Sequence, residues 1–210
     1  LERYPSSHQA IPKNILTKLS RIYPAEQPAV KRVAMDAVLG LIHTDIMRDK
    51  LFNFIKNNYS SEEPEIKAHI NEDLCRVFYG GFLQSQILNF FSEHFNDEPE
   101  ETQNIIFAKL LLTIRTEAIQ PKILAFIDAG YHSFTDKQKR MFYEMFYEML
   151  PECDSLAHAL VSMVNRIIES ESESIRGEVT EALKKLFADD MERREPRLIP
   201  VLLSARGFCS

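Results

Sequence analysis

Histidine and cysteine side chains most often carry catalysis or bind metals, and this chain has six of the first and three of the second. They are His8, His43, His69, His94, His132, His158, Cys75, Cys153 and Cys209. No two histidines have the spacing of a zinc-binding HExxH motif, and none lies beside a cysteine pair. Gly80 and Gly81 are an isolated pair inside a helical pattern, so they indicate close helix packing and not a phosphate-binding loop. We therefore expect no enzyme, metal or cofactor, and keep a helical enzyme whose site assembles only in space as an alternative.

A row of polar side chains is better suited to binding, because each member stands just before a short apolar cluster. The row consists of Asn14, Lys50, Gln86, Lys122, His158 and Arg197. Asn53 and Asn89 follow two of these residues at the i+3 spacing that keeps side chains on one helix face. We predict that this row forms a ladder that binds a peptide. The alternative interpretation is that these positions are polar simply because they face water.

The densest aromatic segment of the chain is MFYEMFYEML at residues 141–150. Its Met and Phe residues fall on one helical stripe, whereas Tyr143 and Tyr147 lie one turn apart on a different side. In one interpretation the stripe is core and the tyrosines cover a groove between helices. In the other, methionines and tyrosines form an exposed patch that grips a partner helix.

The elements that position these residues follow from the apolar clusters themselves. The clusters begin at Ile15, Leu51, Ile87, Ile123, Ala159 and Leu198. The first five starts are 36 residues apart and the last follows after 39. A constant interval of this size is typical of stacked two-helix units, each of which hides its apolar face against its neighbour. The pattern predicts an all-α fold, an α-α superhelix of about six two-helix repeats.

A second register advances in step with the first. Val38, Leu74, Leu110 and Phe146 are also 36 residues apart and mark the first helix of successive units. Together the registers predict eleven helices joined by short links. The expected bounds include 12–22, 28–43, 66–82, 85–95, 154–168 and 198–203, and a helix capped by Asp49.

Two segments show a family resemblance. VKRVAMDAVLGL at 30–41 resembles the first helix of a HEAT repeat, and PRLIPVLL at 196–203 resembles the second. The resemblance covers residues 11–206 and leaves 1–10 and 207–210 as tails. It implies a single protein-binding scaffold in which the second helices line a concave face. Tubulin-binding TOG domains are HEAT arrays that use an exposed tryptophan, and this chain has no Trp.

Charge and composition narrow the expected partners. The net charge is −6 without a dense basic run, which favours a protein partner, a peptide or helix, over nucleic acid. RNA binding through a local basic face is kept as an alternative. No apolar run approaches 18 residues, so we expect no membrane partner. Three distant cysteines favour a cytoplasmic or nuclear setting over a disulfide framework. The expected helix 198–203 is apolar on most sides and is a candidate surface for self-association.

Overall fold

The computed structural model describes residues 13–43, 47–150 and 154–191, and these residues form helices and turns without any strand. The expected all-α class is therefore confirmed for the described part of the chain. The chain divides into two compact units, Leu1–Lys109 and Leu110–Ser210, and the boundary falls inside helix α6 (Glu100–Thr113).

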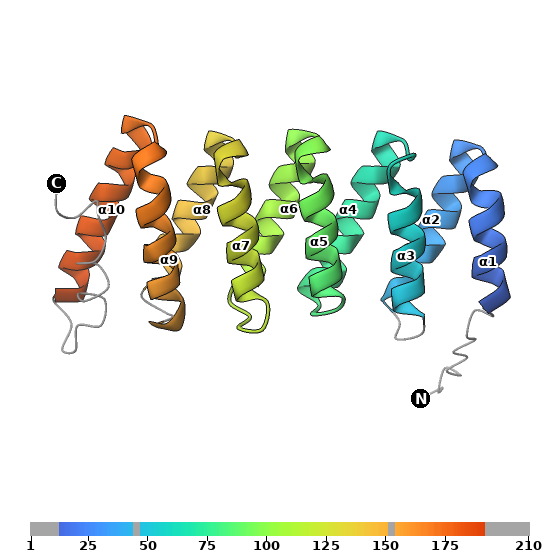
Figure 1. The fold of residues 1–210 in the computed structure, drawn as a ribbon, viewed down its shortest axis with the longest axis horizontal. Coiled ribbons are helices and arrows are strands. Elements are labelled where there is room, and N and C mark those ends of the chain that lie inside the picture. The colour runs from blue at the N-terminus through green and yellow to red at the C-terminus, as the bar shows by residue number, and fades with distance from the viewer. Residues whose placement is uncertain (1–12, 44–46, 151–153, 192–210) are drawn as a thin grey trace, which may run out of the picture. The chain divides into compact units, whose positions relative to one another are not determined.

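The first unit contains two layers of helices (Figure 1). The layer that holds the second helix of each predicted repeat consists of α1 (Lys13–Ile22), α3 (Arg48–Tyr59) and α5 (Gln84–His94). The other layer contains α2 (Pro28–Ile42) and α4 (Pro64–Tyr79). Prolines occupy the first position of α2 and α4, where a missing N–H costs no hydrogen bond. These bounds agree with the predicted helices to within a few residues.

Two local expectations in this unit are wrong. Asp49 does not cap α3, because it lies in the first turn and Met47 is the capping residue. Gly80 and Gly81 do not lie inside a helix, because α4 ends at Tyr79. Gly81 takes a left-handed φ of 86°, and the backbone N–H of Phe82 donates to the carbonyl of Val77 at 3.2 Å. This is a Schellman ending, in which glycine supplies the conformation that other residues adopt at a cost.

The second unit also has two layers of helices, continued from the end of α6. Helices α7 (Gln120–Gly130) and α9 (Asp154–Ile167) form one layer, and Arg166 of α9 contacts Asp128 of α7 at 3.0 Å. Helices α8 (Asp136–Met149) and α10 (Glu173–Met191) form the other. Thr135 and Gln138 form a capping box at the start of α8. The expected helix 198–203 lies outside the described residues.

A short turn follows each of the helices α1, α3, α5, α7 and α9, and all five turns are made in the same way. The short 3-10 helices are η1 (Tyr23–Ala25), η2 (Phe95–Asp97), η3 (Tyr131–Ser133) and η4 (Ile168–Ser170), and Tyr59 starts an equivalent turn. In each turn a backbone N–H donates to the carbonyl three residues earlier, as from Glu62 to Tyr59 at 3.0 Å. Tyr23, Tyr59, Phe95 and Tyr131 are 36 residues apart, so the turns mark the repeat as clearly as the apolar clusters do.

Buried polar clusters accompany these turns. The Tyr59 hydroxyl donates to the carboxylate of Glu98 and accepts a hydrogen bond from the Asn71 amide at 2.7 Å. The ammonium of Lys67 lies 5.3 Å from the centre of the Tyr59 ring, a cation–π contact. Burial is the main reason that the pKa of Tyr59 is raised, and the carboxylate of Glu98 raises it further.

A related cluster recurs two repeats later in the sequence, in altered form. In the second unit the Tyr131 hydroxyl donates to that of Tyr143 at 2.9 Å, and Lys139 contacts Glu171 at 3.2 Å. At the register between these two clusters the chain places apolar residues instead. There Phe95, Phe107 and Phe134 stand where Tyr59, Asn71 and Glu98 stand 36 residues earlier. At this register the three hydrogen-bonding positions are therefore replaced together.

Candidate peptide-binding groove

A hollow of about 430 Å³ lies between α1 and α3 in the first unit. It is lined by Leu16, Thr17, Ser20, Met47, Lys50, Asn53, Phe54 and Asn57. A second hollow of about 300 Å³ is lined by Met47, Arg48, Asp49, Lys50 and Leu83. Met47 and Lys50 line both hollows, so the two adjoin at the start of α3. We call the pair of hollows the α3 groove.

The α3 groove has an apolar floor and polar walls. Leu16 and Phe54 are buried, whereas Lys50, Asn53 and Asn57 are exposed. Neither asparagine side chain has a hydrogen-bond partner among the described residues, and the Lys50 ammonium has no ion-pair partner there. An asparagine amide both donates and accepts, so it matches the N–H and C=O groups of a peptide backbone. The arrangement can therefore hold an extended segment while an apolar side chain rests on the floor.

The backbone is strained where α3 and α5 begin. Met47 has a φ of 66° and Leu83 a φ of 51°, both in the left-handed region that residues with a Cβ seldom adopt. Each such residue costs about 1–2 kcal/mol, and strained residues cluster at functional sites. Ile119 holds the equivalent position before α7 and has an ordinary φ of −107°. Among the described residues other than glycine, a positive φ occurs only at Met47 and Leu83, which both line the α3 groove.

Neighbouring side chains hold the strained loops in place. Arg48 Nε donates to the carbonyl of Ile42 at 3.0 Å, and its guanidinium lies 3.9 Å from the centre of the Phe82 ring. Asp49 accepts a hydrogen bond from Gln86 at 2.9 Å. Arg48, Asp49 and Gln86 are therefore engaged in structure, and Lys50 is left to meet a ligand.

The structure brings only part of the predicted row together. Lys50 and Asn53 line the α3 groove, and Gln86 and Asn89 are exposed on the neighbouring helix α5. Lys122 and His158 are exposed on α7 and α9 of the second unit. The row is interrupted there, because the position equivalent to Asn53 is Ala125 on α7 and the buried Val161 on α9. Asn14 belongs to α1, but its side chain lies outside the described part, as does Arg197.

Sequence reasoning missed several residues of the groove. Asn57 lies seven residues after Lys50, and this spacing already placed it on the same helix face. Thr17 and Ser20 follow the same logic on α1. Met47 had no comparable signal, because a left-handed conformation at a residue other than glycine or asparagine is not encoded in a local pattern.

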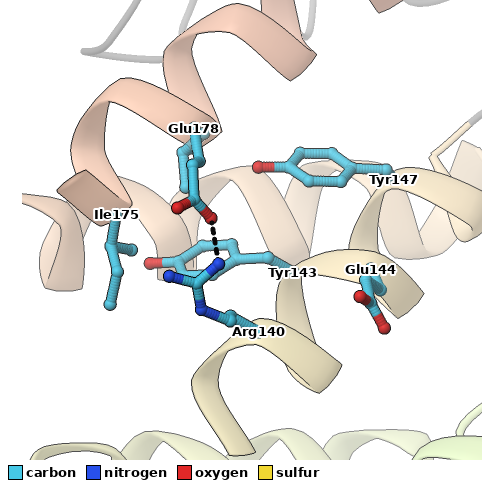
Figure 2. Close-up of a pocket in the computed structure, with 7 residues that line it drawn as sticks. Arg140, Tyr143, Glu144, Tyr147, Ile175 and Glu178 are labelled. Carbon is cyan, nitrogen blue, oxygen red and sulfur yellow. Dashed lines mark hydrogen bonds and ion pairs between the residues drawn. The ribbon is translucent and has the colours of Figure 1, made fainter. Parts of the chain in front are cut away.

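Tyr143 and Tyr147 lie in a different place, on the face of α8 that packs against α10 (Figure 2). Tyr143 is buried and Tyr147 half-buried, so the exposed tyrosine patch offered as an alternative is wrong for Tyr143. Burial raises the pKa of both hydroxyls. With Arg140 and Glu178, which form an ion pair at 3.0 Å, they line a hollow of about 90 Å³. That space suits a few water molecules and no larger ligand.

No histidine or cysteine of the described ranges lines these hollows. His69 of α4 lies 2.9 Å from Asp36 of α2 and 3.8 Å from Asp73, and links the two helices. Cys75 is buried, and its burial raises the pKa of the thiol to about 12. Cys153 and Cys209 lie outside the described residues. Within the described ranges, no group of His, Cys, Asp and Glu side chains is arranged to hold a metal ion.

None of the helices that the structure describes combines the length and apolar character needed to span a membrane. Comparisons of the chain with models of known families, with curated proteins and with solved structures find no match.

Proposed function

We propose that this protein is an interaction scaffold that binds an extended segment of another protein in the α3 groove. The observation that carries the proposal is the combination of an apolar floor with the unpartnered side chains of Lys50, Asn53 and Asn57. These exposed side chains are free to exchange water for a ligand, and amides beside an apolar floor match the backbone and one apolar side chain of a peptide.

The proposal includes the architecture that the resemblance implies. The two-layer arrangement inside each unit and the 36-residue register support a HEAT-like α-α superhelix of about six repeats. In such an array the layer with α1, α3 and α5 is the concave one. The α3 groove would then be part of an extended binding surface.

The chemistry of the groove specifies the ligand. Lys50 favours an acidic side chain, the asparagines pair with backbone amides, and Leu16 and Phe54 accept one apolar side chain. Among the described residues, the charged side chains that line the groove are Arg48, Asp49 and Lys50. Two cations beside one carboxylate release few counterions, so this surface does not support RNA as the ligand.

The proposal is tested with peptides selected from a display library against the whole protein, whose affinities are then measured by fluorescence anisotropy. Lys50→Glu is expected to weaken binding about tenfold or more, because it places a carboxylate opposite an acidic ligand residue. Asn53→Ala and Asn57→Ala should each weaken it several-fold by leaving backbone groups unpaired.

Two control variants sharpen this test. Arg32→Glu changes charge by the same amount at an exposed position on α2, in the other layer, and should leave affinity unchanged. Adding Lys122→Glu to Lys50→Glu should produce no further loss if the site is the α3 groove, and a second loss if the predicted row is continuous. Selected peptides that bind Lys50→Glu and Asn53→Ala as tightly as the unaltered protein would refute the proposal.

A further inference from the structure

The second hollow of the α3 groove is lined by two apolar residues at positions where helices usually begin with a polar one. Met47 is the N-cap of α3 and Leu83 is the N-cap of α5, and neither helix receives a capping hydrogen bond from that side chain. Serine, threonine, aspartate and asparagine stabilise this position, because their side-chain oxygens accept from N–H groups of the first turn. Both residues also have a left-handed φ, so the local structure disfavours methionine and leucine at these positions for two separate reasons.

A third residue in the same register shows what an apolar N-cap does in the second unit. Met47, Leu83 and Ile119 are 36 residues apart, and Ile119 is the N-cap of α7. Ile119 is 2% exposed and has an ordinary φ, so its side chain belongs to the core. Met47 and Leu83 are half-buried, and both line the second hollow. In the first unit this register therefore supplies two apolar side chains to a surface hollow and not to the core.

We infer that the second hollow is a pocket for a second apolar side chain of the bound protein segment, distinct from the side chain that rests on Leu16 and Phe54. The inference rests on the proposed function of the α3 groove and adds a specificity site to it. The ligand side chain lies between Met47 and Leu83. It gives these two residues the apolar contacts that Ile119 obtains from the core, and it leaves water in doing so.

The position of Lys50 orders the parts of the ligand. Lys50 lines both hollows, and its ammonium has no ion-pair partner among the described residues. The second hollow is also lined by Arg48 and Asp49, and the Asp49 carboxylate already accepts a hydrogen bond from Gln86 at 2.9 Å. These charges favour one acidic ligand residue where the two hollows adjoin. The ligand class is therefore an extended segment with an acidic residue between two apolar ones.

The probe is an array of synthetic peptides with a central glutamate, leucine at one or at two positions, and serine and glycine elsewhere. Their affinities for the full chain are measured by fluorescence anisotropy. Peptides with one leucine on each side of the glutamate, at a favoured spacing, should bind at least tenfold more tightly than the best one-leucine peptide, since a second side chain is buried. Peptides with both leucines on the same side of the glutamate should show no such gain.

Asparagine variants of the two N-caps locate the second leucine. Asparagine tolerates a left-handed φ and is a good N-cap, so Leu83→Asn and Met47→Asn remove the apolar side chain and should keep the helical circular dichroism. Each should abolish the gain from the second leucine, and Leu83→Asn should leave the affinity of one-leucine peptides unchanged. The matched control is Ile105→Asn, which changes an exposed apolar residue of α6 and should alter neither affinity.

Four results would overturn the inference. A second leucine that adds no affinity, or a gain that Leu83→Asn leaves intact, would refute the pocket, and one-leucine peptides that still depend on Lys50 would leave the proposed function standing. Absence of binding by every peptide of the array would count against both. A tenfold gain for one-leucine peptides in Ile46→Ser would make the chain's own Ile46 the occupant. Self-association in sedimentation experiments that Leu83→Asn abolishes would make a second copy the occupant.

Discussion

The polar cluster around Tyr59 gives the sharpest prediction about stability, because the chain contains its own apolar replacement. Glu98 is buried and accepts hydrogen bonds from the Tyr59 hydroxyl and from Asn71, the latter at 3.2 Å. In the next register all three positions hold phenylalanine. We therefore compare the single variant Glu98→Phe with the triple variant that also carries Tyr59→Phe and Asn71→Phe.

The magnitude follows from counting the groups left without a partner. Glu98→Phe removes the acceptor of the Tyr59 hydroxyl and one of two acceptors of the Asn71 amide. An unsatisfied buried donor costs about 1–3 kcal/mol, and hydrogen bonds to charged groups lie at the upper end of that range. We expect the single variant to lose about 3–4 kcal/mol. The triple variant removes donors and acceptor together, so it should stay within about 1.5 kcal/mol of the unaltered protein.

The measurement is urea unfolding followed by far-ultraviolet circular dichroism, with hydrogen exchange on α4 and α5 as a local readout. The local readout is needed because repeat proteins do not always unfold in one step. A positive coupling energy of about 2 kcal/mol or more supports a cooperative cluster. Two results would refute the reasoning: a Glu98→Phe loss below about 1 kcal/mol, or a triple variant whose loss equals the sum of the three single variants.

Three further predictions concern titration, reactivity and strain. Burial raises the pKa of five tyrosines, Tyr23, Tyr59, Tyr131, Tyr143 and Tyr147. The folded chain keeps these protons above the ordinary tyrosine pKa of about 10, so its stability is complete below that pH and falls as the pH rises further. Tyrosinate absorbance should therefore appear together with loss of the helical signal. Tyrosinate in a fully helical chain would contradict this. In a Cys153→Ser, Cys209→Ser variant, the buried Cys75 should react with a thiol reagent at about pH 8 only as fast as the protein unfolds locally. Reaction at the rate of a free thiol would show that Cys75 is not buried. Met47→Gly should be about 1 kcal/mol more stable than Met47→Ala, since only glycine relieves the left-handed strain. Both variants should bind selected peptides more weakly. Equal stabilities would show that the strain is absent.

The sequence predicted the helices well because burial and spacing are both local signals. A helix with one buried face has apolar residues every three or four positions. Val38, Leu74 and Leu110 are all buried, as their register predicts. The endings were harder to predict. The sequence predicts a packing role for the Gly80–Gly81 pair, because a glycine that ends a helix and a glycine that admits a neighbouring helix look alike in sequence.

The turn clusters show a second kind of signal that spacing alone did not reveal. The residue types of Tyr59, Lys67 and Glu98 recur 36 residues earlier and 72 or 73 residues later. Their role, however, depends on three elements that meet in one buried place. A tyrosine at a helix end or a glutamate before a proline has a sufficient local explanation, such as the favourable charge at a helix start. Only the structure shows that the three side chains interact, and that Phe95 and Phe134 replace two of them as a set.

The candidate site illustrates why function was harder to place than fold. The sequence put Lys50, Gln86 and Lys122 in one row with equal weight, because each precedes an apolar cluster. The structure separates them: Lys50 faces a groove and has no ion-pair partner among the described residues, Gln86 is bound to Asp49, and Lys122 belongs to another unit. Equivalent positions in a repeat place their side chains on the same helix face, but the partners of each side chain depend on the residues of the neighbouring repeat.

Among the residues that the structure describes, three features coincide around α3: amides without a protein partner, two adjoining hollows, and left-handed residues at the helix starts. At the equivalent positions of the second unit, Ile119 has ordinary backbone geometry, Ala125 replaces an asparagine, and Val161 is buried. The second unit keeps the core register without these features, so packing of the core does not require them in the first unit. Retained strain lowers stability, so under the proposed function it is better explained by a ligand than by folding, and one segment should bind per chain.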